Sequence, residues 1–304
     1  MTPRPVTAYL GPEGTFSHRA AVDLCPPGLG LEPMGTAEDV ISAVEAAEIA
    51  AGVVALENSL EGPVTTNLDR LLHGMSVGLI AGERVLPVSF TAYRTPGDDS
   101  APRVVRTHPF GLAQCATWIR RLGVSTEATA STTGAVVDLR EEPSPGTVAV
   151  GPAGSGEPLG LEAIATAIED RLATTRFVLL RPTCPGPTGR DRTAFAIAPE
   201  RDEPGSLLRL LQEFSLRGIN LAVIVSRPTR SDLGRYVFYL ECEGHLTSTP
   251  VQAAAAALMR AHDNVRILGT FPADPARAEP PSPPEAAPER VPPGLEHFLD
   301  RIDP

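Results

Sequence analysis

Short apolar runs recur along the first two thirds of the chain, each bounded by glycine, proline or polar residues. Runs of this length with a polar lead-in are typical of buried strands. The strands predicted in this way are Thr7–Leu10, Val53–Leu56, a longer strand-rich segment Val77–Ala92, Val104–Val105, Thr126–Ala130, Thr147–Val150 and Thr175–Leu180. Amphipathic stretches at 37–49, 111–121 and 131–139 have helical spacing and lie between them. This alternation predicts mostly parallel sheets with helices on both faces, in two lobes that two crossing strands link across a cleft.

The pattern changes after Arg181–Arg190, a proline- and glycine-rich stretch that is typical of a linker. Strands are predicted at Thr193–Ala198, Ala222–Ser226, Arg235–Cys242 and Val265–Phe271, and helices at Gly205–Leu216 and Val251–Ala261. Their order, βαββαβ, is that of a ferredoxin-like unit. We therefore expect an α/β protein with a two-lobed domain over 5–183, a ferredoxin-like domain over 190–272 and a proline-rich, disordered tail over 273–304.

Composition narrows the classes of function. The chain has 304 residues, 42% of them hydrophobic, and a formal net charge of −11 with no lysine, so it lacks the basic surface that nucleic acid binding needs. Its four cysteines are far apart, without the spacing of a metal site, and are expected to be reduced thiols. No signal-peptide pattern precedes Tyr9, and no apolar run approaches the ~18 residues that span a bilayer. A cytoplasmic protein without a metal or a membrane partner is expected.

Thr175 and Arg176 are the strongest candidates for chemistry. They stand at the start of the apolar run Phe177–Leu180, so the strand would hold both side chains on rigid backbone. A guanidinium binds a carboxylate through two hydrogen bonds, and a neighbouring hydroxyl donates or accepts one more. The pair therefore fits an acidic substrate, with an edge strand and a solvated arginine as the alternative.

Polar residues at other strand ends would line the same cleft. Thr15 follows a glycine turn and begins a helix, whose N-terminal N–H groups favour an anion, unless this is an ordinary strand-to-helix turn. Asn58 and Ser59 follow a buried strand and would donate to substrate oxygens, cap the next helix, or both. Ser131 and Thr132 stand at a further strand-to-helix junction. His108 precedes a proline, so we assign it to a loop and not to a catalytic base.

These motifs, in this order, resemble the prephenate dehydratase family. The matching stretches are Tyr9–Ser17, Glu57–Ser59 with Glu61–Gly62, Thr175–Phe177, Arg217–Leu221 and Ser226–Pro228. The last two resemble the phenylalanine-sensing motifs of an ACT domain, and the match covers roughly residues 7 to 272. The resemblance implies a catalytic domain like the type II periplasmic binding proteins, followed by the ACT domain.

The resemblance also implies a lyase that converts prephenate to phenylpyruvate without a cofactor. Thr175 matches the family's catalytic threonine and would hydrogen-bond the departing ring hydroxyl, while Arg176 would bind a substrate carboxylate. The residues expected to bind substrate are Thr15, Asn58, Ser59, Ser131, Thr132 and Phe177.

Regulation by L-phenylalanine follows from the same resemblance. The expected effector-binding residues are Gly218, Ile219, Asn220, Leu221, Ser226, Arg227 and Pro228. Phenylalanine would bind between two ACT domains, so a homodimer or homotetramer is expected. The alternative for Gly218 and Asn220 is a helix-to-strand turn that the fold needs in any case.

Two other functions stay open on the sequence. One is a non-aromatising prephenate decarboxylase of a specialised pathway, which Ala173 and Phe110 keep open because they differ from the family's usual residues. The other is a catalytically silent amino-acid sensor, which would have no need of the Thr175–Arg176 pair.

Overall fold

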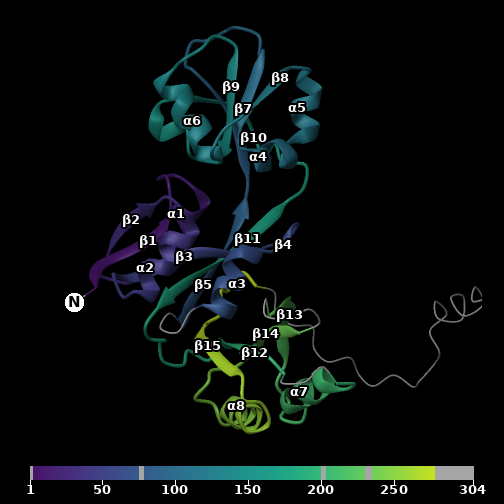
Figure 1. The fold of residues 1–304 in the computed structure, drawn as a ribbon. Helices are drawn as coiled ribbons and strands as arrows, with labels where there is room; N and C mark the ends of the chain where they lie inside the picture. Colours follow the sequence, from purple (N-terminus) through teal and green to yellow (C-terminus); the bar gives the residue numbers. More distant parts are fainter. Residues whose placement is uncertain (1–2, 75–78, 200–202, 230–234, 278–304) are drawn as a thin grey trace, which may run out of the picture. The chain divides into compact units, whose positions relative to one another are not determined.

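The computed structural model describes residues 3–74, 79–199, 203–229 and 235–277 (Figure 1). The chain divides into two units, Met1–Asp274 and Pro275–Pro304, and the fold below is that of the first unit. Most of the predicted tail, 273–304, lies outside the described residues.

Among the described residues, ten strands form one sheet that contains Thr175. In sheet order, nine of them are β13 (Leu221–Pro228), β14 (Tyr236–Glu243), β12 (Asp191–Ile197), β15 (Val265–Pro272), β5 (Leu79–Val88), β11 (Ala173–Arg181), β3 (Ile49–Asn58), β1 (Arg4–Leu10) and β2 (Gly30–Met34). The remaining strand, β4 (Gly62–Pro63), pairs with β3. β1 is parallel to β2 and β3, whereas β11 is antiparallel to β3 and β5.

A second sheet is built from the middle of the chain. Its order is β10 (Glu162–Thr166), β6 (Phe90–Arg94), β9 (Thr147–Pro152), β7 (Val104–Thr107) and β8 (Ser125–Ala128). β7 is parallel to β8 and β9, but β6 is antiparallel to β9 and β10. The prediction of mostly parallel sheets is therefore wrong where the chain passes between the sheets. It leaves the first sheet after Val88 and returns at Ala173 beside the strand by which it left, which makes β11 antiparallel to β5.

Helices cover the faces of these sheets. Among the described residues they are α1 (Phe16–Leu24), α2 (Ala37–Glu45), α3 (Thr65–His73), α4 (Pro109–Gln114), α5 (Ala116–Leu122), α6 (Thr132–Glu141), α7 (Ser206–Ser215) and α8 (Thr249–Ala261), with a single 3₁₀ turn at Glu157–Leu159. The helix predicted over 111–121 is interrupted at Cys115. The Asp170 carboxylate accepts a hydrogen bond from the backbone N–H of Thr117 and so marks the start of a separate helix.

The C-terminal strands and helices follow each other as β12, α7, β13, β14, α8 and β15, which confirms the predicted βαββαβ order. Helices α7 and α8 pack on one face of these strands through a core that includes Phe195 and Phe214. The opposite face packs against other strands of the same sheet. Tyr239 of β14 lies in one core cluster with Val178 and Leu180 of β11. The sheet therefore folds over at the β15–β5 pair, and β14 faces β11.

Gly269 permits the close approach of β15 to β5. It pairs with Ile80, has a φ of +148°, and a Cβ added to it would lie 2.1 Å from the Ile80 carbonyl oxygen. Gly269→Ala should therefore lower the free energy of unfolding by about 2–4 kcal/mol, from backbone strain and overpacking together. Urea unfolding followed by circular dichroism measures the change.

The matched control is Gly186→Ala. An added Cβ at Gly186 would meet no atom within 4 Å, and its φ is not in the positive range. We expect this variant to differ from the parent by less than about 0.5 kcal/mol. Equal stabilities of the two variants would contradict the proposed role of Gly269.

Candidate functional site

Thr175 and Asn58 lie side by side on neighbouring strands. The register of β11 and β3 pairs the two residues directly, and Asn58 Nδ2 donates a hydrogen bond of 3.0 Å to Thr175 Oγ1. Because the Thr175 oxygen accepts this hydrogen bond, its own hydroxyl hydrogen remains available to a further acceptor. The predicted proximity of Thr175 and Asn58 is confirmed.

The orientation of the Asn58 amide is fixed by backbone groups. Its Oδ1 accepts hydrogen bonds from the backbone N–H groups of Leu60 (2.9 Å) and Glu61 (3.2 Å), and its side chain is buried. The Nδ2 group must therefore face Thr175. Asn58 does not cap α3, since Val64 stands at that N-cap position without a side-chain hydrogen bond.

Ser59 joins the loop after β3 to β11. Its backbone N–H donates to the Thr174 carbonyl, and its Oγ accepts from the Thr174 N–H, both at 2.9 Å. Ser59 is exposed and, like Asn58, does not cap α3. It holds the strand segment next to Thr175 in place while its hydroxyl hydrogen can still be donated.

Two capped helix N-termini, those of α1 and α6, approach each other. Thr15 caps α1 by accepting from the His18 N–H at 3.1 Å, and Ser131 caps α6 by accepting from the Gly134 N–H at 2.8 Å. A Cβ added to Gly14 would lie 3.4 Å from Cγ2 of Thr133, so the loop before α1 contacts the first turn of α6. Thr132, the first residue of α6, is half-buried. The predicted junctions at Thr15, Ser131 and Thr132 therefore lie close together.

Phe177 is placed differently from its prediction as a substrate contact. Only 2% of the residue is exposed, and its ring lies in a core cluster with Tyr9, Ala20 and Ala21, beneath α1. The ring supports β11 from below and offers no surface to a ligand.

Arg176 also differs from its prediction. Strand alternation directs it to the opposite face from Thr175, where it is 4% exposed. Its Nε lies 2.6 Å from Glu83 Oε2, and its Nη2 lies 2.6 Å from Glu241 Oε1. Burial alone would lower the pKa of Arg176, but the carboxylates, Glu241 foremost, outweigh it and raise the pKa well above its ordinary value. The guanidinium is thus enclosed by internal carboxylates and not directed to the surface that carries Thr175.

Sequence reasoning missed Glu83, Glu241 and Asp274. Each is buried, and the Asp274 N–H donates to Glu83 Oε1 at 2.9 Å. The sequence offers no clear signal for two of them, because Glu83 is followed directly by Arg84 and Glu241 shares its strand with Glu243. A buried carboxylate needs a buried cation, and Arg176 lies 2.6 Å from both.

The residues of the predicted phenylalanine-sensing motifs are already bonded within the chain. Gly218 has a φ of +66° in the turn after α7, Ile219 packs in the core beneath that helix, and the Asn220 Nδ2 donates to Glu243 at 3.0 Å. Leu221, Ser226 and Pro228 lie on the edge strand β13. Arg227 donates two hydrogen bonds to Asp69 of α3, at 2.8 and 2.9 Å.

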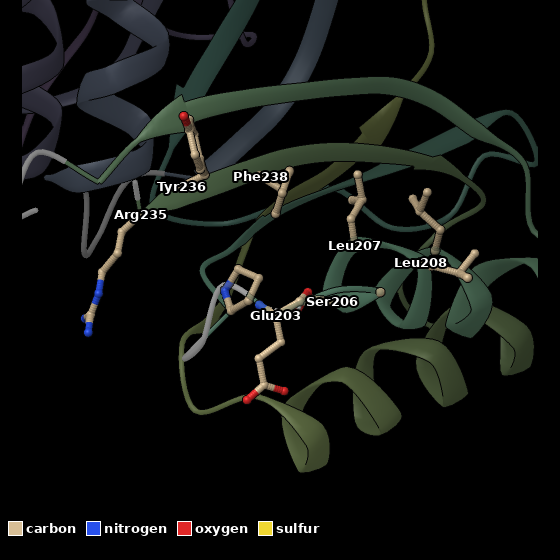
Figure 2. Close-up of a pocket in the computed structure, with 10 residues that line it drawn as sticks. Glu203, Ser206, Leu207, Leu208, Arg235, Tyr236 and Phe238 are labelled. Atoms are coloured by element: carbon tan, nitrogen blue, oxygen red, sulfur yellow. Dashed lines mark hydrogen bonds between the residues drawn. The ribbon is translucent and has the colours of Figure 1, made fainter. Parts of the chain in front are cut away.

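A pocket of about 390 Å³ lies on the C-terminal strands and helices (Figure 2). Figure 2 shows side chains from α7, such as Leu207 and Leu208, and from β14, such as Tyr236 and Phe238. None of the predicted sensing residues lines it, although Tyr236 pairs with Pro228 in the sheet. Sequence reasoning missed this pocket because its wall combines two elements distant in sequence.

The described residues hold no group of three His, Cys, Asp or Glu side chains that could bind a metal ion. No helix among them is both long and apolar enough to cross a membrane.

The chain is similar to prephenate dehydratases both in sequence and in fold. The family model described as prephenate dehydratase matches residues 7–184. A prephenate dehydratase of Mycolicibacterium smegmatis is 37% identical over 293 residues, which cover 91% of this chain and 93% of the relative. The solved prephenate dehydratase of Arthrobacter aurescens in complex with L-Phe has a TM-score of 0.80 and 32% identity, and covers 91% of this chain and 93% of that one. A structure described as GqqA, a novel type of quorum quenching acylase, has a TM-score of 0.77 and 29% identity, and covers 90% of this chain and 100% of that one.

These similarities extend over nearly the whole chain in both sequence and fold, and they define a mixed α/β lyase with two sheets. The chain belongs to the prephenate dehydratase family. Enzymes of this family convert prephenate to phenylpyruvate in phenylalanine biosynthesis.

Proposed function

We propose that prephenate binds at the residues around Thr175 and that its ring hydroxyl leaves next to Thr175 Oγ1. The observation that supports this most directly is the Asn58–Thr175 hydrogen bond of 3.0 Å. Asn58 donates to the threonine oxygen, so the threonine hydrogen is available to the leaving oxygen. The same hydrogen bond makes the Thr175 hydroxyl a better donor, because hydrogen bonds in a chain polarise one another.

The reaction needs positioning more than strong acid chemistry. The bond from the ring to the carboxylate breaks, CO₂ leaves, and the electron pair stays in the ring as the carbon–oxygen bond breaks. The departing hydroxide takes up a proton and leaves as water, while the ring becomes aromatic. Thr175 stabilises the negative charge that develops on the leaving oxygen, which is the kind of contact that lowers a barrier.

The substrate carboxylates need donors other than Arg176, since its guanidinium is held by Glu83 and Glu241. We assign this role to the N-terminal N–H groups of α1 and α6, with the hydroxyls of Ser59, Ser131 and Thr132. Helix N-termini carry partial positive charge and unpaired N–H groups, which favour a bound carboxylate. The Thr15 hydroxyl already donates to the Pro12 carbonyl at 3.0 Å, so Thr15 acts through the helix that it caps.

The finer fold assignments belong to the same proposal. Residues 5–183 form a bilobal catalytic domain like the type II periplasmic binding proteins, and residues 190–272 form an ACT domain. The βαββαβ order of the second part supports this, as does the passage of the chain from one sheet to the other and back. The enzyme acts in the cytoplasm, where its family's biosynthetic pathway operates.

L-phenylalanine is the proposed regulatory ligand, and it binds at Gly218, Asn220 and the strand from Leu221 to Pro228. The Arthrobacter relative was solved in complex with L-Phe, which supports the same ligand here. Ile224 of the edge strand β13 is 50% exposed, so a second copy can pair along this strand to form a homodimer or a dimer of dimers.

Turnover of prephenate by the purified enzyme, with and without phenylalanine, tests the proposal. Phenylpyruvate absorbs ultraviolet light in alkali, and a dihydro product of simple decarboxylation does not. Appearance of this absorbance supports the dehydratase. Loss of prephenate without the absorbance would indicate the decarboxylase, and binding of phenylalanine without any turnover would indicate a sensor.

A further inference from the structure

Five side chains with charged or ionisable groups are buried together where β14 faces β11 and β5. They are Glu83, Arg176, Arg192, Tyr239 and Glu241, and none is more than 7% exposed. We call them the Arg176 cluster. Glu83 comes from β5 and Arg176 from β11, whereas the other three come from the C-terminal strands β12 and β14.

The contacts of the cluster form a continuous chain. Arg176 lies 2.6 Å from Glu83 on one side and 2.6 Å from Glu241 on the other, and its guanidinium carbon lies 5.9 Å from the centre of the Phe271 ring. Arg192 approaches Glu241 at 3.6 Å, and the Tyr239 hydroxyl also donates to Glu241. Burial, together with Glu241, raises the pKa of Tyr239 well above its ordinary value, so the phenol keeps its proton and acts as a donor.

Within the cluster two carboxylates face two guanidinium groups, and the partly exposed Glu57 adds a third carboxylate 4.0 Å from Arg176 Nη1. Buried charges are tolerated when each has a partner of opposite sign, and removal of one partner leaves the other uncompensated. Arg176 bridges a carboxylate on β5 and one on β14, so the fit of the two parts of the sheet depends on it. Among the described residues, the β15–β5 backbone pairing between those parts is limited to Gly269 and Ile80.

Arg176 is also adjacent to Thr175 in the same strand. The two side chains project to opposite faces, so a shift of the Arg176 guanidinium tilts the backbone that carries the Thr175 hydroxyl. The Asn58–Thr175 hydrogen bond is 3.0 Å long, and a change of a few tenths of an ångström would weaken it. The position of the hydroxyl thus depends on a carboxylate that the C-terminal part of the chain supplies.

We propose that Arg176 is a positioning residue, through which Glu241 of the C-terminal ββ pair holds the Thr175 hydroxyl in its reactive place. The proposal rests on the proposed role of Thr175 and replaces the contact with substrate that the sequence predicts for Arg176. It also provides a direct path from the C-terminal strands to the site, because any ligand that shifts β14 moves Glu241.

Glu241→Gln tests the proposal, since it removes one negative charge and keeps the shape of the side chain. We expect kcat for prephenate to fall by about 10-fold or more and KM to stay within about twofold, because the substrate does not contact this cluster. The decisive measurement is the same substitution in a Thr175→Ala background. There the hydroxyl to be positioned is absent, so Glu241→Gln should lower kcat by less than about twofold further.

Tyr239→Phe serves as a second, milder variant if Glu241→Gln does not fold. It removes the hydroxyl that donates to Glu241 and leaves every charge in place. We therefore expect kcat to fall by about two- to fivefold, and not in the Thr175→Ala background. Glu162→Gln is the matched control, because it opens a surface ion pair with Arg94 of similar length (2.9 Å) on the second sheet. It should leave kcat and KM unchanged.

Three results would overturn the proposal. Equal losses in the wild-type and Thr175→Ala backgrounds would mean that the cluster only stabilises the fold. A rise in KM of about 10-fold in Arg176→Lys, with kcat kept, would return Arg176 to the role of substrate contact. Unchanged kcat in both Glu241→Gln and Tyr239→Phe would show that Glu241 does not position the Thr175 hydroxyl. Turnover by the unsubstituted enzyme is measured first, so a failure of the dehydratase assignment is seen separately.

Discussion

Thr175→Ala should lower kcat for prephenate by about 100-fold and leave KM within about twofold. The hydroxyl is proposed to act on the leaving oxygen, whose charge develops only as the carbon–oxygen bond breaks. A contact made mainly in the transition state affects kcat and not substrate affinity. Steady-state turnover followed by phenylpyruvate absorbance gives both constants, and circular dichroism checks the fold.

Two variants serve as controls for this substitution. Thr175→Ser keeps a hydroxyl at the same position and should retain most of the activity. Thr174→Ala removes an exposed hydroxyl from the neighbouring residue and keeps the backbone groups that bind Ser59. A Thr175→Ala enzyme with full kcat, or a Thr174→Ala enzyme as slow as Thr175→Ala, would refute the role of the Thr175 hydroxyl.

Asn58→Asp should be the most damaging single change at the site, with kcat/KM reduced by about 1,000-fold. The substitution keeps the shape of the side chain and the oxygen that accepts from the Leu60 and Glu61 N–H groups. It replaces the Nδ2 donor by an acceptor, so the Thr175 hydroxyl would turn to donate to the new carboxylate and would be lost to the leaving group. A negative charge would also stand beside a dianionic substrate. Rates at a series of substrate concentrations give kcat/KM directly.

Asn67→Asp is the matched control for a buried amide. The Asn67 Nδ2 donates to the Ala55 carbonyl at 2.8 Å, and the residue is 7% exposed, much as Asn58 is. This variant should lose stability while its folded fraction keeps kcat/KM within about fivefold. Similar losses of kcat/KM in the two variants would show that any buried carboxylate near β3 has this effect, and the reversed hydrogen bond would not be its cause.

The elements that the sequence predicts correctly are those with a strong local pattern. Buried strands such as Val53–Leu56, the cap at Thr15 and the strand-to-helix junction at Ser131 follow from hydrophobic runs and from short-range hydrogen bonds. The edge strands β2 and β10 are not predicted, because each has at most partly buried residues and therefore lacks a hydrophobic pattern. Their existence depends on a neighbouring strand and not on their own residues.

Within the site, too, the sequence predicts only what a local pattern determines. The proximity of Thr175 to Asn58 follows from polar residues at strand ends, and the structure places them on paired strands. The partners of Arg176 could not be foreseen, because Glu241 lies on a C-terminal strand that meets β11 only after the sheet folds over. Strand alternation alone, however, already separates Arg176 from Thr175, since adjacent residues of a strand project to opposite sides.

The passage of the chain between the two sheets has a consequence for synthesis on the ribosome. β5 ends at Val88, and its partner β11 begins only at Ala173, after the whole second sheet has been made. The second sheet takes its strands from residues between these points, so it can form while the first is still incomplete. We expect the second sheet to form first in the nascent chain. β11, which carries Thr175, would add between β5 and β3 only afterwards.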